Sequence, residues 1–187
     1  MEPGKSLQGH LLVASAVLVD LNFRKTVVLM IHHDDDGALG LVLNRPSDMK
    51  VDELWDKIAE TPCQSEQVLH VGGPVEGPLM ALHTHEDLSE IEVLPGVYFC
   101  VQKQNLNELV ARPDDSFRLF VGHAGWGGGQ LAGELAEGLW LTTPAKPPHI
   151  FEPGDDIWES VFREITRASG MLQVLKVKHV PPDPSMN

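Results

Sequence analysis

The stretch Phe120-Val121-Gly122-His123-Ala124-Gly125-Trp126-Gly127-Gly128-Gly129-Gln130-Leu131 places five glycines between an apolar run and a short helical pattern. Glycines at this density indicate that the backbone lies close to another group, which is either a neighbouring segment or a ligand. We expect a helix from about Gln130, and the free amides at its start would favour an anion. No Lys-Ser or Lys-Thr pair follows, and Glu134 and Glu137 would repel a polyphosphate. The stretch therefore predicts either a tight turn packed around Trp126 or part of a surface for a small anion or a partner.

The composition is that of an acidic globular protein. The chain has 187 residues, of which 42% are hydrophobic and 22% are charged, so we predict a single domain over residues 1–187 that buries its own core. The 14 basic and 27 acidic residues give a formal net charge of −13. Because such a charge repels phosphate backbones, direct nucleic-acid binding is disfavoured.

The cysteines and the first apolar run bear on the cellular location. Cys63 and Cys100 match no metal or redox spacing, and we expect both to be reduced thiols, with one disulfide between them as the alternative. The run Leu11–Val19 is too short to cross a bilayer and lacks the flanks of a signal peptide. We interpret it as a buried strand and expect a cytoplasmic protein that does not contact membranes.

The apolar periodicity predicts more strands than helices, in irregular alternation, which indicates an α+β domain. The polar loop from His33 to Gly37 has the form of a hairpin turn. The predicted strands are Leu11–Val19, Thr26–Ile31, Leu39–Leu43, Val68–Val71, Leu79–His83, Val97–Val101, Phe117–Val121 and Leu139–Leu141.

Three further helices are predicted. One carries the apolar stripe of residues 51–58, and a second begins with Asn105 as its N-cap and stops at Pro113. A third begins at Asp155 and Asp156 and ends at Gly170. We expect the proline-rich tail, residues 181–187, to be disordered.

Two shorter motifs are candidates for a ligand or partner surface. Asn44 and Arg45, ahead of Pro46, would present an amide and a guanidinium to a ligand, or cap the turn and pair with an acid. Gly72 and Gly73 end a strand and indicate a turn with positive φ. Together with Gly125, Trp126 and Gln130, these residues form the predicted binding surface if the turns meet in space.

His83 and His85 form the strongest enzyme-like motif. On a strand, residues two apart share a face, so both imidazoles would reach one metal ion. The surrounding sequence approaches the first cupin motif, but it is one residue short and no second motif supplies a third histidine. Ordinary surface histidines are the alternative interpretation. We predict no cofactor, and no complete catalytic set is recognisable.

Taken in chain order, these motifs resemble those of the AlgH/YqgE family of small bacterial proteins, over about residues 8–170. Ala16 and Gly128 stand where the family usually or often has proline, so those two turns are expected to differ in detail. The matching residues are Gly9–Ala14, Asp20, Phe23, Val27–Leu29, Gly37–Pro46, Gly72–Val75, Phe120–Leu131, Glu134, Leu135, Gly138, Trp140 and Trp158.

The resemblance implies an α+β fold whose mixed, mostly antiparallel strands wrap into a pseudo-barrel flanked by two to four helices. It implies no known reaction, and the label of transcriptional regulator that some members carry rests on genetics. We therefore expect a non-catalytic binding or regulatory module that acts through a protein partner or a small anionic ligand. The alternatives are a metal-dependent enzyme using His83 and His85, and a regulator that binds DNA directly.

Overall fold

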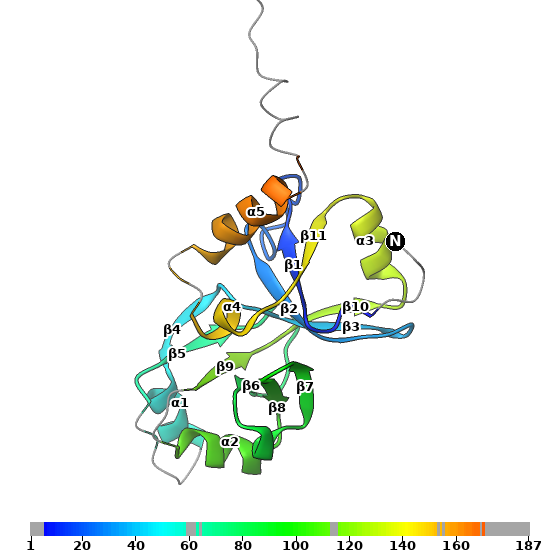
Figure 1. The fold of residues 1–187 in the computed structure, drawn as a ribbon. Coiled ribbons are helices and arrows are strands. Elements are labelled where there is room, and N and C mark those ends of the chain that lie inside the picture. Colours follow the sequence, from blue (N-terminus) through cyan, green and yellow to red (C-terminus); the bar gives the residue numbers. More distant parts are fainter. Residues whose placement is uncertain are drawn as a thin grey trace, which may run out of the picture.

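The computed structural model describes residues 6–58, 63, 65–112, 116–152, 154, 156–168 and 170, and in this part of the chain eleven strands form two sheets (Figure 1). Sheet A is entirely antiparallel, with the spatial order β10 (Ala124–Gly127), β3 (Gly37–Val42), β2 (Val27–His33), β1 (His10–Ala14) and β11 (Trp140–Pro144). Sheet B has one parallel pair, β5 with β9, and the order β4 (Pro46–Lys50), β5 (Val68–Val71), β9 (Phe117–Val121), β6 (Met80–His83), β8 (Val97–Cys100) and β7 (Ile91–Leu94).

The predicted α+β class with mostly antiparallel strands is confirmed, and the described strands form two open sheets rather than a closed barrel. Five α-helices occur in the described part, where two to four were expected, together with a short 3-10 turn at Glu86–Leu88. The helices are α1 (Val51–Ile58), α2 (Lys103–Val110), α3 (Gln130–Ala136), α4 (Pro147–Phe151) and α5 (Ile157–Ala168).

The core is layered because several strands are buried on both faces. In β1, Leu11 and Val13 belong to the cluster between the two sheets, whereas Leu12 and Ala14 belong to the cluster on the outer face of sheet A. Such a strand has an unbroken apolar run because successive side chains point to opposite faces. Helix α3 covers the outer face of sheet A, α1 and α2 cover that of sheet B, and α5 lies beside β1 and β11 (Figure 1).

Local sequence explains the clearest helix starts. In α1, the buried residues Val51 and Trp55 lie one turn apart, and acidic side chains occupy the first turn, where they interact favourably with the helix dipole. In α5, Oδ1 of Asp156 accepts a hydrogen bond from the Glu159 amide at 2.9 Å, as predicted for a residue that starts this helix. Asp155, Pro113 and residues 181–187 lie outside the described residues.

Two sequence predictions are wrong in detail. The predicted strand Leu11–Val19 ends at Ala14, and the chain then forms a loop in which Val17 and Val19 are 63% and 79% exposed. Helix α2 begins at Lys103, so Asn105 lies inside it rather than at its N-cap. The Asn105 amide instead donates to the carbonyl of Leu88, a long-range contact that local sequence does not reveal.

The chain passes between the sheets where two glycine turns lie against each other. The Gly72 amide donates to the Val121 carbonyl at 2.8 Å, and Val75 and His123 exchange backbone hydrogen bonds of 3.0 and 2.9 Å. A Cβ atom added to Gly72 would lie 2.3 Å from the Gly122 carbonyl oxygen, and one added to Gly73 would lie 2.2 Å from the His123 carbonyl carbon. These glycines therefore permit a backbone-to-backbone contact, which we call the sheet crossover.

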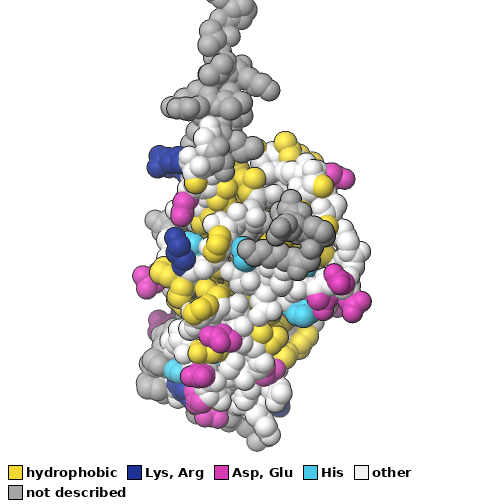
Figure 2. Space-filling view, turned by 45° about the vertical axis from the view of Figure 1, so that its right-hand side comes forward, with side chains coloured by type: hydrophobic (Ala, Val, Ile, Leu, Met, Phe, Trp, Pro, Cys, Tyr) yellow, Lys and Arg dark blue, Asp and Glu magenta, His cyan; other side chains and the backbone are white. Residues whose placement is uncertain are grey.

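In the described part of the chain, no helix is long and apolar enough to cross a membrane. On the face that Figure 2 presents, acidic side chains are scattered over the surface, and lysine and arginine side chains are few. This distribution agrees with the net charge of −13 and leaves no basic stripe on that face for a phosphate backbone.

The sheet crossover predicts a strong difference between two glycine substitutions. Gly73→Ala places a methyl group inside backbone atoms of His123 and Ala124, so we expect it to lower the free energy of unfolding by about 3 kcal/mol or more. Gly127→Ala is the matched control, because nothing lies within 4 Å of its added Cβ atom. Urea denaturation measures both variants. Equal stability of Gly73→Ala and the wild type would contradict this account of the crossover.

Candidate functional site

Asn44 and Arg45 bind the loop that precedes β2. The side-chain Oδ1 of Asn44 accepts from the Val27 amide at 3.0 Å, and its Nδ2 donates to the Lys25 carbonyl at 2.8 Å. Nη2 of Arg45 donates to the Arg24 carbonyl at 2.7 Å. Both predicted site residues therefore hold the loop before β2 against the end of β3. The sequence alternative differs from this arrangement, because Asn44 bonds backbone 17 and 19 positions away rather than its own turn, and Arg45 contacts a carbonyl rather than an acid.

Trp126 and Gln130 meet at one carboxylate. Oε2 of Glu134 accepts from the indole nitrogens of Trp126 and Trp140, each at 2.8 Å, and Oε1 accepts from Nε2 of Gln130 at 2.9 Å. The side-chain Oε1 of Gln130 in turn accepts from the Gly127 amide at 3.1 Å. Glu134 thus fixes the glycine-rich turn to α3 and to Trp140, a role beyond the repulsion of a polyphosphate expected from its charge.

The structure brings some of the predicted site residues together. Gly72 and Gly73 pack on the segment from Gly122 to Ala124, and the Val71 amide donates to the Arg45 carbonyl at 2.8 Å. The Trp126–Gln130 contacts belong to the outer face of sheet A, where they are organised by Glu134. The seven candidate residues therefore form two groups, joined through the sheet crossover rather than around one ligand-sized hollow.

A cavity of about 240 Å³ lies beside Asn44, where β3, β9 and the start of α5 meet. Its size is close to the lower end of small-ligand pockets, which begin at roughly 300 Å³. The residues that line it are Leu43, Asn44, Pro46, His70, Arg118, Gly154, Asp156 and Ile157.

Arg118 is the charged group of this cavity and is only 7% exposed. Its Nη1 donates to the Ile150 carbonyl and its Nη2 to the Leu43 carbonyl, each at 2.7 Å, so the side chain links β9 to α4 and to the end of β3. Burial lowers the pKa of Arg118 to about 10, which leaves it protonated at neutral pH. No carboxylate pairs with it among the described residues. A guanidinium has five N–H donors, so donors remain for a further acceptor.

His70 lies on the same cavity wall and is held neutral. Burial, and then the nearby positive charge of Arg118, lower the pKa of His70 from 6.5 to about 4. Its Nδ1 atom is buried and has no hydrogen-bond partner within the described residues. The imidazole ring packs against Phe120, with ring centroids 5.6 Å apart. The cavity thus combines a buried cation, a neutral histidine and, at its edge, the carboxylate of Asp156.

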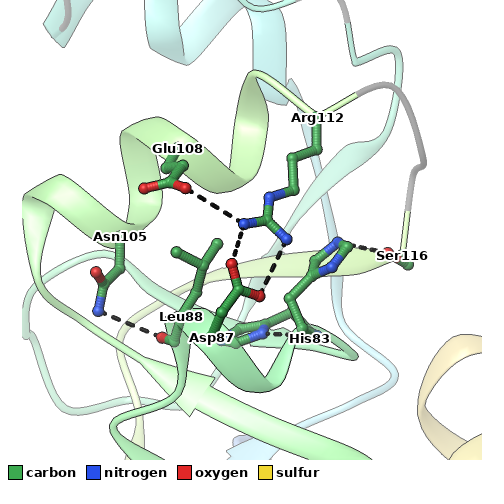
Figure 3. Close-up of polar contacts among 8 residues, drawn as sticks. His83, Asp87, Leu88, Asn105, Glu108, Arg112 and Ser116 are labelled. Carbon is green, nitrogen blue, oxygen red and sulfur yellow. Dashed lines mark hydrogen bonds and ion pairs between the residues drawn. The ribbon is translucent and has the colours of Figure 1, made fainter.

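His83 and His85 lie in a separate polar cluster at the end of β6 (Figure 3). Their ring centroids are 6.4 Å apart, and Nδ1 of His83 accepts from the His85 amide at 3.3 Å. Nε2 of His85 lies 3.0 Å from Oγ of Ser116. One nitrogen of each ring is therefore already engaged, and no group of three metal-binding side chains occurs in the described ranges.

An ion pair closes this cluster on its outer side. Both carboxylate oxygens of Asp87 contact the guanidinium of Arg112, which also reaches Oε1 of Glu108 at 3.3 Å (Figure 3). Burial, and then the positive charges of His85 and Arg112, lower the pKa of His83 from 6.5 to about 4. His83 is fully buried and keeps a proton on Nε2, because Nδ1 accepts a hydrogen bond.

The sequence analysis missed Arg118 and His70. The available signal was Arg118 itself, a charged residue inside the apolar strand Phe117–Val121, because a buried arginine needs a partner or a role. His70 is likewise a polar residue within a short apolar strand, β5. Neither residue indicates the other, because His70 and its register partner Phe120 are 50 positions apart in the sequence, and strands β5 and β9 become neighbours only in the sheet.

Comparisons with known proteins agree with the family resemblance. A family model described as AlgH-like matches residues 11–169. A UPF0301 protein from Chlorobium chlorochromatii is 38% identical over 190 residues, which cover 98% of this chain and 96% of the relative. A UPF0301 protein from Streptomyces avermitilis is 34% identical over 194 residues, with coverages of 97% and 96%.

Two solved structures are also similar to this chain. The solution structure of the AlgH protein from Pseudomonas aeruginosa has a TM-score of 0.71 and 29% identity, over 86% of this chain and 89% of that one. The crystal structure of a protein from Corynebacterium diphtheriae has a TM-score of 0.70 and 28% identity, over 88% and 90% of the two chains. The similarity therefore covers both sheets and is not confined to one motif.

The buried His83 predicts a loss of stability in mild acid. Its pKa is lower in the folded state than in the unfolded chain, so the unfolded chain binds more protons between pH 6.5 and pH 4. The contribution of His83 is complete above pH 6.5 and declines as the pH falls through this window. We expect about 2 kcal/mol of the stability lost between pH 7 and pH 5 to come from His83.

The variant His83→Asn tests this effect, because asparagine keeps an acceptor for the His85 amide but does not titrate. Urea denaturation at pH 7 and pH 5 should show a smaller difference for this variant than for the wild type. An unchanged difference in His83→Asn would contradict the prediction.

Proposed function

The chain belongs to the AlgH-like family, and we propose that it is a non-catalytic binding module whose ligand is a small anion bound by Arg118. The observation that carries this proposal is the buried guanidinium on the cavity wall beside Asn44, which no carboxylate of the described residues neutralises. A cation in a poorly hydrated setting interacts far more strongly with an anion than one in water does. We place this activity in the cytoplasm.

The volume and the polar groups of the cavity limit the class of ligand that it can bind. Its volume of about 240 Å³ suits a molecule of a few heavy atoms better than a nucleotide. Asp156 also lines the cavity, and although its Oδ1 accepts from Glu159, the carboxylate can accept further bonds. A small carboxylate with a neighbouring hydroxyl donor would therefore satisfy Arg118 and Asp156 together.

A regulatory role fits this proposal better than direct DNA binding does. The net charge of −13 opposes contact with phosphate backbones, so a regulator of this composition would act through another protein. The bound anion would then change the affinity of the protein for that partner. The metal-dependent alternative at His83 and His85 has less support, because only two imidazoles meet there and one nitrogen of each is engaged.

Propionate and lactate form a matched pair of probes for the cavity. They share a carboxylate and differ by one hydroxyl group, so we expect lactate to bind about three- to ten-fold more tightly, as one added hydrogen bond allows. Isothermal titration calorimetry measures both affinities. Arg118→Lys keeps the charge but loses the planar fork, and it should weaken both ligands about ten-fold or more.

Asp156→Asn supplies a second test that leaves the buried arginine intact. Asparagine still caps α5, but the negative charge facing the ligand is removed, so propionate should bind about three-fold more tightly. Glu137→Gln, which removes one negative charge on the other side of the fold, is the control for net charge. No binding of either acid, or equal affinities in the wild type and both cavity variants, would overturn the anion proposal in favour of a protein partner.

A further inference from the structure

Another cavity, of about 580 Å³, lies between the tip of the β2–β3 hairpin and the start of α3, which contacts β3 (Figure 1). Its walls come from the hairpin, from the glycine-rich turn with α3, and from Ser6, the first residue that the structure describes. The cavity shares no lining residue with the Arg118 cavity. It is therefore a separate feature of the fold.

Ser6 and Leu7 are attached to the hairpin through His33, which also lines the cavity. Oγ of Ser6 donates to the His33 carbonyl at 2.9 Å, and the Leu7 amide donates to Nδ1 of the His33 ring at 3.0 Å. Leu7 is only 6% exposed, and it belongs with the cavity residue Leu131 to the apolar cluster on the outer face of sheet A. We call residues 6–7 the N-terminal strap.

The chain that follows the strap is attached independently of His33. The Gly9 amide donates to the Met30 carbonyl at 2.9 Å, and the Gly9 carbonyl accepts from the Ala145 amide at 2.9 Å. Gly9 also has a φ of 72°, a left-handed conformation that glycine adopts at little cost. The strap can therefore leave the hairpin without disturbing the two backbone contacts that Gly9 makes with sheet A and with the end of β11.

The contact between the strap and the His33 ring requires an unprotonated Nδ1 atom. The donor is a backbone amide, so the ring nitrogen must supply a lone pair, which an imidazole nitrogen loses when it binds a proton. The neutral ring in this contact therefore carries its proton on Nε2. Histidine is the residue type whose charge changes between about pH 5 and pH 8.

The charged groups that line the cavity with His33 are Asp34 and Asp35, on its own hairpin. Asp34 already accepts from the Asp36 and Gly37 amides, whereas the side chain of Asp35 is exposed. A protonated ring thus has carboxylate acceptors on the hairpin but offers no acceptor to the Leu7 amide. The lining residues that face it from the glycine-rich turn and α3 carry no charge, and they are Gly127, Gly129, Leu131 and Ala132.

We propose that the N-terminal strap is a pH-sensitive closure of this cavity, held in place while His33 is neutral and released when Nδ1 of His33 is protonated. Protonation removes the acceptor of the Leu7 amide and places a second N–H group against it. Leu7 then leaves the apolar cluster, and Leu131, which is only 2% exposed in the closed form, becomes accessible from the cavity.

Nitrogen-15 spectra of the imidazole rings and amide hydrogen exchange test this closure together. The spectra should show neutral His33 with its proton on Nε2, and they give the pH range of its protonation. The protection factor of the Leu7 amide, which is corrected for the intrinsic pH dependence of exchange, should fall about five- to ten-fold across that range, as the loss of one hydrogen bond allows. The protection factor of Gly9, which donates to Met30, should stay constant and report an intact fold.

Two variants separate the titration of His33 from its packing, and both should fold because His33 is only partly buried. Asparagine places a carbonyl oxygen near the position of Nδ1 and does not titrate, so His33→Asn should keep Leu7 protected at both pH values. His33→Gln carries its acceptor one bond further out, so Leu7 should be poorly protected at both.

A neutral nitroxide in solution measures the opening of the cavity. It should enhance the relaxation of the Leu131 methyl groups in wild-type protein only when His33 is protonated. It should do so at both pH values in His33→Gln and at neither in His33→Asn.

The proposal is overturned if neutral His33 carries its proton on Nδ1, or if Leu7 is equally protected before and after His33 is protonated. It is also overturned if His33→Asn shows the wild-type loss of protection, or if Leu131 stays inaccessible to the nitroxide when Leu7 is released. These results leave the Arg118 proposal untouched, since the two cavities have no residue in common.

Discussion

The two sheets are connected where the backbone of Gly72 and Gly73 lies against the backbone of Gly122 and His123. At this point β9 of sheet B continues into β10 of sheet A, and the turn after β5 runs alongside. Any side chain larger than hydrogen at Gly72 or Gly73 would collide with a main-chain atom, which cannot move as a flexible side chain does. The relative position of the sheets therefore depends on a contact that only glycine permits.

This contact explains why the Arg118 cavity lies where it does. Arg118 precedes the sheet crossover on β9, and Leu43 and Asn44 occupy the other passage between the sheets, from β3 to β4. Arg118 reaches across this junction to carbonyl groups of Leu43 and Ile150, so its charge is fixed at the seam rather than on an exposed face. A ligand bound there would contact both sheets, so its affinity would depend on the position of one sheet relative to the other.

The sequence predicted the elements that depend on local pattern and missed those that depend on distant neighbours. Apolar runs such as Phe117–Val121 revealed strands, but β4, a polar edge strand, and β10, half glycine, carry no such pattern. The glycine-rich stretch predicted that its backbone lies close to another group. That group is another segment of the chain, at Gly73, which contacts His123 and precedes it by 50 positions. Spacing alone does not distinguish that neighbour from a ligand.

The polar atoms that remain unpaired are informative because the protein satisfies others so thoroughly. Glu134 receives two indoles and an amide, and Oε1 of Glu90 accepts from two backbone amides and the Asn105 side chain. Six buried side-chain atoms in the described part lack a partner, on Ser15, Trp55, His70, His83, Asn107 and His123. The glycine motifs, the most conspicuous feature of the sequence, serve the backbone contact between the two sheets.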